Sequence, residues 1–85
     1  MSTSTLLLFA SAQTYTNESK LLLPAPLTIP QLYSHLEFLY PGITAKVLSS
    51  AALTVNLEYV DVHNDKDFII KAGDEVAVIP PVSSG

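Results

Sequence analysis

Apolar runs separated by short polar stretches divide the chain into strand-like segments around one helix-like segment. Residues 5–10 form an apolar run bounded by polar residues, which is typical of a buried strand. Residues 11–19 are a polar connection suited to a hairpin, and the apolar run over residues 20–23 predicts a second strand. We expect that strand to end at Pro24, because proline has no amide hydrogen to donate within a sheet.

The strongest local pattern predicts a helix over residues 29–39. Thr28 is followed three residues later by Gln31, as in the capping box that begins many helices, and Leu27 stands at the position of a hydrophobic staple. Apolar residues then recur at helical spacing, at Ile29, Leu32, Leu36 and Leu39. The Tyr-Pro-Gly segment at residues 40–42 ends this pattern.

The second half of the chain contains further strand patterns. Residues 44–50 suggest a short helical turn, and residues 53–60 read as a strand with β-branched and aromatic side chains. A short extended piece at residues 68–70 is followed by a turn at Gly73 and a last strand over residues 76–79. Two strands, one helix and then more strands predict an α+β fold in which a sheet wraps over one main helix.

The composition is that of one small packed domain without thiol chemistry. The 85 residues suffice for one domain, and an apolar share of 48% suffices for a core. The absence of cysteine excludes disulfides, thiolate metal sites and a cysteine nucleophile. Residues 6–12 imitate the apolar part of a secretory signal peptide, but no lysine or arginine precedes them, which favours a first strand. No apolar run approaches transmembrane length.

The charge of the chain argues against a nucleic-acid partner. The formal net charge is −4, and there is no arginine. The lysines are scattered, at Lys20, Lys46, Lys66 and Lys71. A surface that follows phosphates needs clustered positive charge, so nucleic-acid binding is not expected. If the protein takes part in chemistry on an anionic substrate, we expect a basic partner chain to hold the anion.

One acidic series alternates like the first half of a calcium loop. Its members are Asp61, His63, Asp65 and Asp67. A calcium loop also needs glycine at its sixth position and glutamate at its twelfth, whereas this chain has Lys66 and Ala72 there. The series is therefore interpreted as a solvated turn, and no metal site is predicted. The other histidine, His35, likewise has no acid or nucleophile at a supporting spacing.

The C-terminal residues are expected to form a tail, in which two prolines that restrict the backbone are followed by residues with small side chains. Pro80 and Pro81 fix φ and favour an extended exit from the last strand. Small residues follow, and they are Val82, Ser83 and Ser84. Gly85 lacks a Cβ, so its carboxylate can be approached from either side. Such an end could enter a narrow channel of a partner and present its carboxylate to chemistry there. The alternative is an inert, frayed terminus.

This tail also carries a resemblance to a known family. The segment GDEVAVIPPVSSG, preceded by VNLEYVD, resembles the end of the small, sulfur-carrying subunits of molybdopterin synthase. Leu8-Phe9-Ala10 matches the first-strand motif of that family, and LYSHLEFLYPG stands where the family has its helix. The resemblance covers almost the whole chain. It implies a ubiquitin-like β-grasp fold over residues 1–79, with a mixed sheet packed on one main helix, and an extended tail over residues 80–85.

The resemblance implies a mechanism centred on Gly85. A ubiquitin-activating-type enzyme would adenylate this terminal carboxylate, and a sulfur transfer would convert it to a thiocarboxylate, a C-terminal 1-thioglycine. The tail would then insert into the large synthase subunit of a heterotetramer and give sulfur to a cyclic pyranopterin monophosphate, building the dithiolene of molybdopterin. The catalytic residues would lie on the large subunit.

The same resemblance implies roles for the residues around Gly85. Val82, Ser83 and Ser84 would line the partner's channel, and the partner interface would include Phe9, Ile79, Pro80 and Pro81. No tightly bound cofactor, nucleic acid or membrane is implied, and the expected location is the cytosol.

Two alternatives stay open at the level of the sequence. A carrier for thiamine synthesis or tRNA thiolation would use the same chemistry, although such relatives usually lack the double proline at residues 80–81. A β-grasp interaction domain with an inert tail is the other alternative. Its best support is Ser84, because the sulfur carriers normally end in two glycines.

Overall fold

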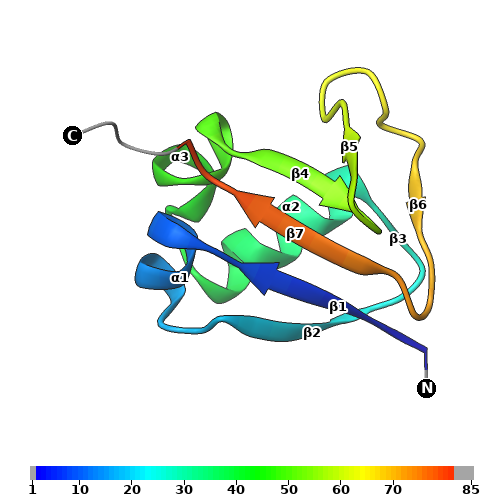
Figure 1. Ribbon diagram of the computed structural model, residues 1–85, viewed down its shortest axis with the longest axis horizontal. Helices are drawn as coiled ribbons and strands as arrows, with labels where there is room; N and C mark the ends of the chain where they lie inside the picture. The colour runs from blue at the N-terminus through cyan, green and yellow to red at the C-terminus, as the bar shows by residue number, and fades with distance from the viewer. Residues whose placement is uncertain (1, 82–85) are drawn as a thin grey trace.

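A five-stranded mixed sheet with one long helix across one of its faces forms the framework of this computed structural model, which describes residues 2–81 (Figure 1). The strand order is β2-β1-β7-β4-β5, where β1 and β7 run parallel and the other neighbours antiparallel. The strands are β1 (Thr3–Leu8), β2 (Lys20–Pro24), β4 (Ala52–Val55), β5 (Glu58–Val60) and β7 (Glu75–Ile79). A second sheet has two short strands, β3 (Leu27–Thr28) and β6 (Ile69–Ile70). The predicted α+β class is confirmed.

Helix α2 (Ile29–Leu39) has the predicted bounds because its start is determined locally. The amide N–H of Gln31 donates to Thr28 Oγ1 at 3.3 Å, and the amide N–H of Thr28 donates to Gln31 Oε1 at 2.8 Å. This reciprocal pair is the predicted capping box, and it satisfies two backbone donors that a helix start would otherwise leave without partners.

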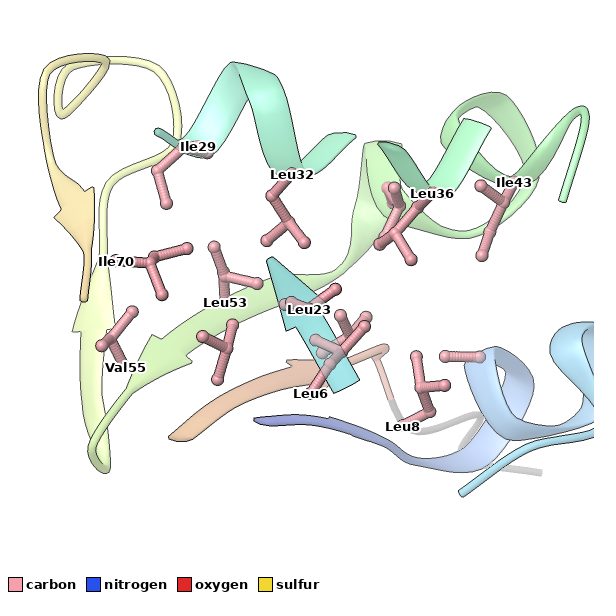
Figure 2. Packing of buried hydrophobic residues seen from close by; sticks show 14 of the residues in the cluster. Leu6, Leu8, Leu23, Ile29, Leu32, Leu36, Ile43, Leu53, Val55 and Ile70 are labelled. Atoms are coloured by element: carbon pink, nitrogen blue, oxygen red, sulfur yellow. The ribbon is translucent and has the colours of Figure 1, made fainter. Parts of the chain in front are cut away.

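The core lies between α2 and the inner face of the five-stranded sheet. Figure 2 shows Ile29, Leu32 and Leu36 of the helix pointing toward side chains of the strands, among them Leu6 and Leu53. All five side chains are almost fully buried. Burial of apolar area on this scale is the main stabilising contribution in a domain of this size.

The prediction of a hairpin loop over residues 11–19 is wrong, because most of this segment belongs to helix α1 (Ala10–Thr16). Strands β1 and β2 on either side still pair antiparallel. The helix buries Ala12, and the hydroxyl of Thr16 donates to the Ala12 carbonyl at 2.9 Å. It ends at Asn17, whose φ of 59° is left-handed. The exposed side of this helix is marked by Ser11, Gln13 and Thr14, whereas Thr16 is buried.

The strand predicted over residues 53–60 is two strands, β4 and β5. They are joined by a tight turn at Asn56 and Leu57, both left-handed with φ of 52° and 72°. Asparagine is common in such a turn, but leucine in place of the usual glycine is rare, so the sequence carries only half of the usual turn signal here. The Asn56 amide N–H donates to the Glu75 carbonyl at 2.7 Å, which holds the turn against the start of β7.

The other predicted elements are confirmed with small shifts at their ends. The helical turn expected near residues 44–50 is α3 (Ile43–Lys46) followed by a 3₁₀ turn, η1 (Leu48–Ser50). Gly73 has a φ of 86° in the turn before β7, as expected. No helix in the described residues 2–81 is long and apolar enough to cross a membrane.

A carboxylate organises the corner between α2 and α3. Glu37 accepts hydrogen bonds from the amide N–H of Gly42 at 2.6 Å and from the amide N–H of Thr44 at 3.1 Å. These bonds stabilise the charged form and lower the pKa of the Glu37 carboxyl, with the Gly42 bond as the larger cause. The corner is also tied to α1, because the Tyr15 hydroxyl donates to the Pro41 carbonyl at 2.7 Å.

The Glu37 corner predicts a loss of stability in acid. Because the folded-state pKa lies below the ordinary value of 4.5, this stabilisation is present above pH 4.5 and is lost as the pH falls through the folded-state pKa. We expect the decrease in urea midpoint between pH 7 and pH 3 to be smaller in Glu37→Gln than in wild type. Glu58→Gln is the matched control on an exposed strand. Equal decreases in wild type and Glu37→Gln would contradict the role given to this carboxylate.

Candidate partner-binding site

The last strand of the described residues, β7, ends in the middle of the sheet. Strand β7 lies between β1 and β4, and its Val78 is level with Leu8 of the parallel strand β1. Phe9 and Ile79 therefore follow at the same end of the sheet. Pro80 is buried and Pro81 is exposed. Figure 1 shows that β7 ends beside α3, at the end of the molecule opposite the start of β1.

The sheet face opposite α2 carries a shallow apolar groove, which we call the outer-face groove. Its volume is about 250 Å³. Its lining residues are Leu7, Phe9, Thr54, Leu57, Tyr59, Glu75, Ala77 and Ile79. Leu57 is 86% exposed and Tyr59 is 76% exposed. Each represents apolar area whose burial would contribute roughly 25 cal/mol per Å². A gathering of such side chains on one face is typical of a protein-binding surface.

The groove continues to the base of the tail. Phe9 and Ile79, two of the predicted interface residues, are brought together in its lining. Pro80 and Pro81 follow Ile79 directly. The remaining predicted site residues, Val82, Ser83, Ser84 and Gly85, lie outside the described residues. The roles of all eight, and the division of the chain after residue 79, stay predictions.

The sequence reasoning missed most of the groove. It did not single out Leu7, Leu57, Tyr59, Glu75 or Ala77 as interface residues. A signal was nevertheless present, since the apolar runs in β1 and β7 do not alternate with polar residues. Strands that are buried on both faces read as continuous apolar runs, whereas α2 covers one face only. The runs therefore indicated that something else covers the second face.

A hydrogen-bond network fixes the end of the groove away from the tail. The Asp74 carboxylate accepts from the Lys71 amide at 2.8 Å and from Asn56 Nδ2 at 3.0 Å, and these bonds lower its pKa, the Lys71 bond most. Asn56 Oδ1 in turn accepts from the Glu75 amide at 3.0 Å. The network joins the β4–β5 turn to the turn before β7. It thereby fixes the positions of Leu57 and Glu75, which line the groove, relative to each other.

The acidic series at residues 61–67 forms an exposed loop. The Asp61 carboxylate accepts from Asn64 Nδ2 at 2.7 Å and from the His63 amide at 3.0 Å. These bonds lower the pKa of Asp61, with the Asn64 side chain as the first cause. The carboxylate is thus occupied by its own loop, which is the geometry of the predicted solvated turn. His35 lies on α2, a different element from the one that carries His63.

Comparison with known families decides the assignment, because a family model described as the ThiS family matches residues 6–85. The chain belongs to the ThiS family. Its relatives include a protein of Aspergillus niger named molybdopterin synthase sulfur carrier subunit, which is 57% identical over the whole of both chains. A human protein of the same name is 37% identical over 73% of this chain and 68% of its own length. The resemblance seen in the tail is therefore confirmed.

Solved structures confirm that this ThiS family member has a ubiquitin-like β-grasp fold. A putative molybdopterin converting factor subunit 1 from Pyrococcus furiosus superposes with a TM-score of 0.78 at 21% identity, covering 96% of this chain and all of the other. A complex of subunits 1 and 2 of the molybdopterin-converting factor from Helicobacter pylori contains a chain that matches with a TM-score of 0.71 at 20% identity, covering 98% of this chain and 99% of the other.

Proposed function

We propose that this ThiS family member is the sulfur carrier subunit of a molybdopterin synthase. The observation with most weight is the 57% identity, over the whole of both chains, to a relative with that name. The geometry supports the proposal, because the last strand leads out of the middle of the sheet, beside an apolar groove. A carrier needs a face that binds the partner close to the point where its last strand ends.

The proposed reaction uses the Gly85 carboxylate in two stages. An activating enzyme of the ubiquitin type joins the carboxylate to AMP from ATP, releasing pyrophosphate. A donor that supplies sulfur at the oxidation level of sulfide then attacks the acyl carbon and displaces AMP, which leaves a thiocarboxylate. In the synthase, the thiocarboxylate sulfur forms a bond to a side-chain carbon of the cyclic pyranopterin monophosphate, and a carbon–oxygen bond of that carbon is broken in exchange. Water then cleaves the acyl–sulfur bond and restores the carboxylate. Two loaded chains are consumed for each dithiolene, in keeping with a heterotetramer in the cytosol.

The residues of this chain indicate which chemical roles it has in the proposed reaction and which roles belong to the large subunit. This chain has no arginine and no cysteine. Among residues 2–81 the groove contains no histidine or lysine. Binding of the pterin phosphate therefore falls to the large subunit, while this chain supplies the docking face and the sulfur. The Helicobacter complex of subunits 1 and 2 agrees with such a partnership at the level of the fold.

The alternatives have less support. A carrier for another pathway would share the family and the fold, but the named relatives at 37% identity and above are molybdopterin synthase subunits. An interaction domain with an inert tail would use the groove alone. The measurement that separates these functions is transfer of sulfur-35 from the loaded chain, mixed with the large subunit, into molybdopterin. Label in molybdopterin supports the proposal, and label that stays on the chain contradicts it.

The affinity of the chain for the large subunit tests the docking face. Leu57→Glu puts a charge into the groove, and we expect it to weaken binding to the large subunit roughly tenfold or more, as for a central interface residue. Phe38→Glu is the matched control, because Phe38 is equally exposed but lies on α2. Equal affinities for the two variants would refute docking through the groove and leave the sulfur chemistry untouched.

Ser84 leads to a prediction about loading. The sulfur carriers that the tail resembles normally have glycine at this penultimate position, and serine cannot visit positive φ as freely. A channel shaped around glycine would also meet the serine Cβ and hydroxyl. We expect thiocarboxylate formation to be slower in wild type than in Ser84→Gly, but not abolished. Equal initial rates, measured by intact mass against time, would refute this prediction.

A further inference from the structure

A second groove lies on the other side of β5, between that strand and β6. Its volume is about 580 Å³, within the range of roughly 300–1,000 Å³ that is common for ligand sites. Tyr59 and Val60 line it from β5, and Phe68 and Ile69 line it from the β6 side. Tyr59, Phe68 and Ile69 are all large and exposed. We call this the β5–β6 groove, and Figure 1 shows the two strands that border it.

The backbone of β5 offers hydrogen bonds to this groove. Among the described strands β5 is the last of its sheet, with β4 as its neighbour. In a hairpin closed by a two-residue turn, the pair that flanks the turn exchanges both hydrogen bonds and the next pair does not. Tyr59 stands in that next pair, opposite Thr54. Its N–H and C=O therefore point away from β4, toward the groove.

The charge of the rim indicates which chain would fit. Glu58, Asp65 and Asp74 line the groove together with one cation, Lys71. Glu58 and Asp65 are exposed. A basic segment would be attracted to this rim, whereas a second copy of this chain, with a net charge of −4, would be repelled.

We propose that the β5–β6 groove binds an extended peptide segment of a partner protein, in which basic and apolar residues alternate, by addition of a strand to β5. In such binding the main chain supplies hydrogen bonds, and alternate side chains enter pockets or face the rim. The apolar side chains of the segment pack on Tyr59, Phe68 and Ile69, and its basic side chains pair with Glu58 and Asp65. This proposal is independent of the sulfur chemistry, because it requires neither Gly85 nor the tail.

The test selects peptides from a random library, roughly eight residues long as for an ordinary strand, against the immobilised full chain. We expect the selected peptides to alternate lysine or arginine with aliphatic or aromatic residues. Bound to the protein, they shift the amide NMR signals of residues 58–60 and 68–71. Peptides without this alternation, or shifts confined to β1 and β7, overturn the proposal, and so does a selection that yields no binder.

Two substitutions at one position separate strand addition from simple apolar contact. Tyr59→Ala removes the side chain but keeps the N–H that points into the groove. Tyr59→Pro removes the side chain and that donor, and proline is tolerated on an edge strand whose N–H faces outward. We expect Tyr59→Pro to bind the selected peptides at least tenfold more weakly than Tyr59→Ala, because the peptide carbonyl is left without a partner. Equal affinities would overturn strand addition.

A second pair of measurements does not depend on the folding of the proline variant. Methylating the central amide nitrogens of a selected peptide, one at a time, should weaken binding to the wild-type protein at alternate positions only. The double variant Glu58→Gln with Asp65→Asn should bind the unmodified peptide roughly tenfold more weakly at low salt, with less difference at high salt. Uniform effects of methylation, or unchanged affinity in the double variant, contradict the proposal.

Discussion

A chain that lacks Gly85 is expected to form no thiocarboxylate and to support no molybdopterin synthesis. Its new terminus would be the Ser84 carboxylate, set back by one residue, or about 3.3–3.6 Å in an extended chain. Reacting groups that are misplaced by about 1 Å already lose on the order of a hundredfold in rate. Rates should therefore fall below detection with both the activating enzyme and the large subunit.

The same truncated chain provides its own control. The outer-face groove is built from residues 7–79 and is unchanged by the deletion. We expect the urea midpoint to be unaffected, and the affinity for the large subunit to stay within about tenfold of wild type, because the tail contacts alone are lost. Thiocarboxylate on the truncated chain would contradict the assignment of Gly85. Complete loss of binding would show that the tail, and not the groove, holds the complex.

Leu36→Ala is expected to produce a large loss of stability. Leu36 is 0% exposed and points from the helix into the core (Figure 2). Truncating a buried leucine costs about 2–5 kcal/mol, through lost transfer free energy and the cavity left behind. A domain of this size has only about 3–5 kcal/mol from its core. The variant should therefore be partly unfolded at 25 °C.

Phe38→Ala is the matched control for Leu36→Ala. It removes a larger apolar side chain from the same helix, but Phe38 is 82% exposed. Its free energy of unfolding should change by less than about 0.5 kcal/mol. Urea unfolding followed by circular dichroism measures both variants. Similar midpoints would show that the assignment of the inner and outer faces of α2 is wrong.

An element of the fold can be predicted from the sequence when the interactions that stabilise it lie within its own segment. Helix α2 was predicted residue by residue, because its capping box and apolar spacing lie within the segment itself. Helix α1 was missed, because its contacts come from elsewhere. Ala12 is buried in the core, and Tyr15 donates to the carbonyl of Pro41, far along the chain. Neither contact can be seen in the local pattern.

The candidate site shows the same limit. Phe9 and Ile79 were selected through the tail and its resemblance to a family, and the structure brings them together in one groove. Leu7, Ala77 and Tyr59 enter the same groove only through the order and register of four strands, β1, β7, β4 and β5. Tyr59 lies in the groove because residues 53–60 form a hairpin and not one strand. This hairpin was not predicted, because leucine at position 57 is not typical of a tight turn.

The intact mass of the chain, after incubation with a ubiquitin-type activating enzyme, ATP and a sulfur donor, tests the central claim most directly. The account predicts the gain that corresponds to one oxygen replaced by sulfur, located at Gly85 by fragmentation and absent when ATP is omitted. An unchanged mass, in a reaction that converts the Aspergillus niger relative, would contradict it.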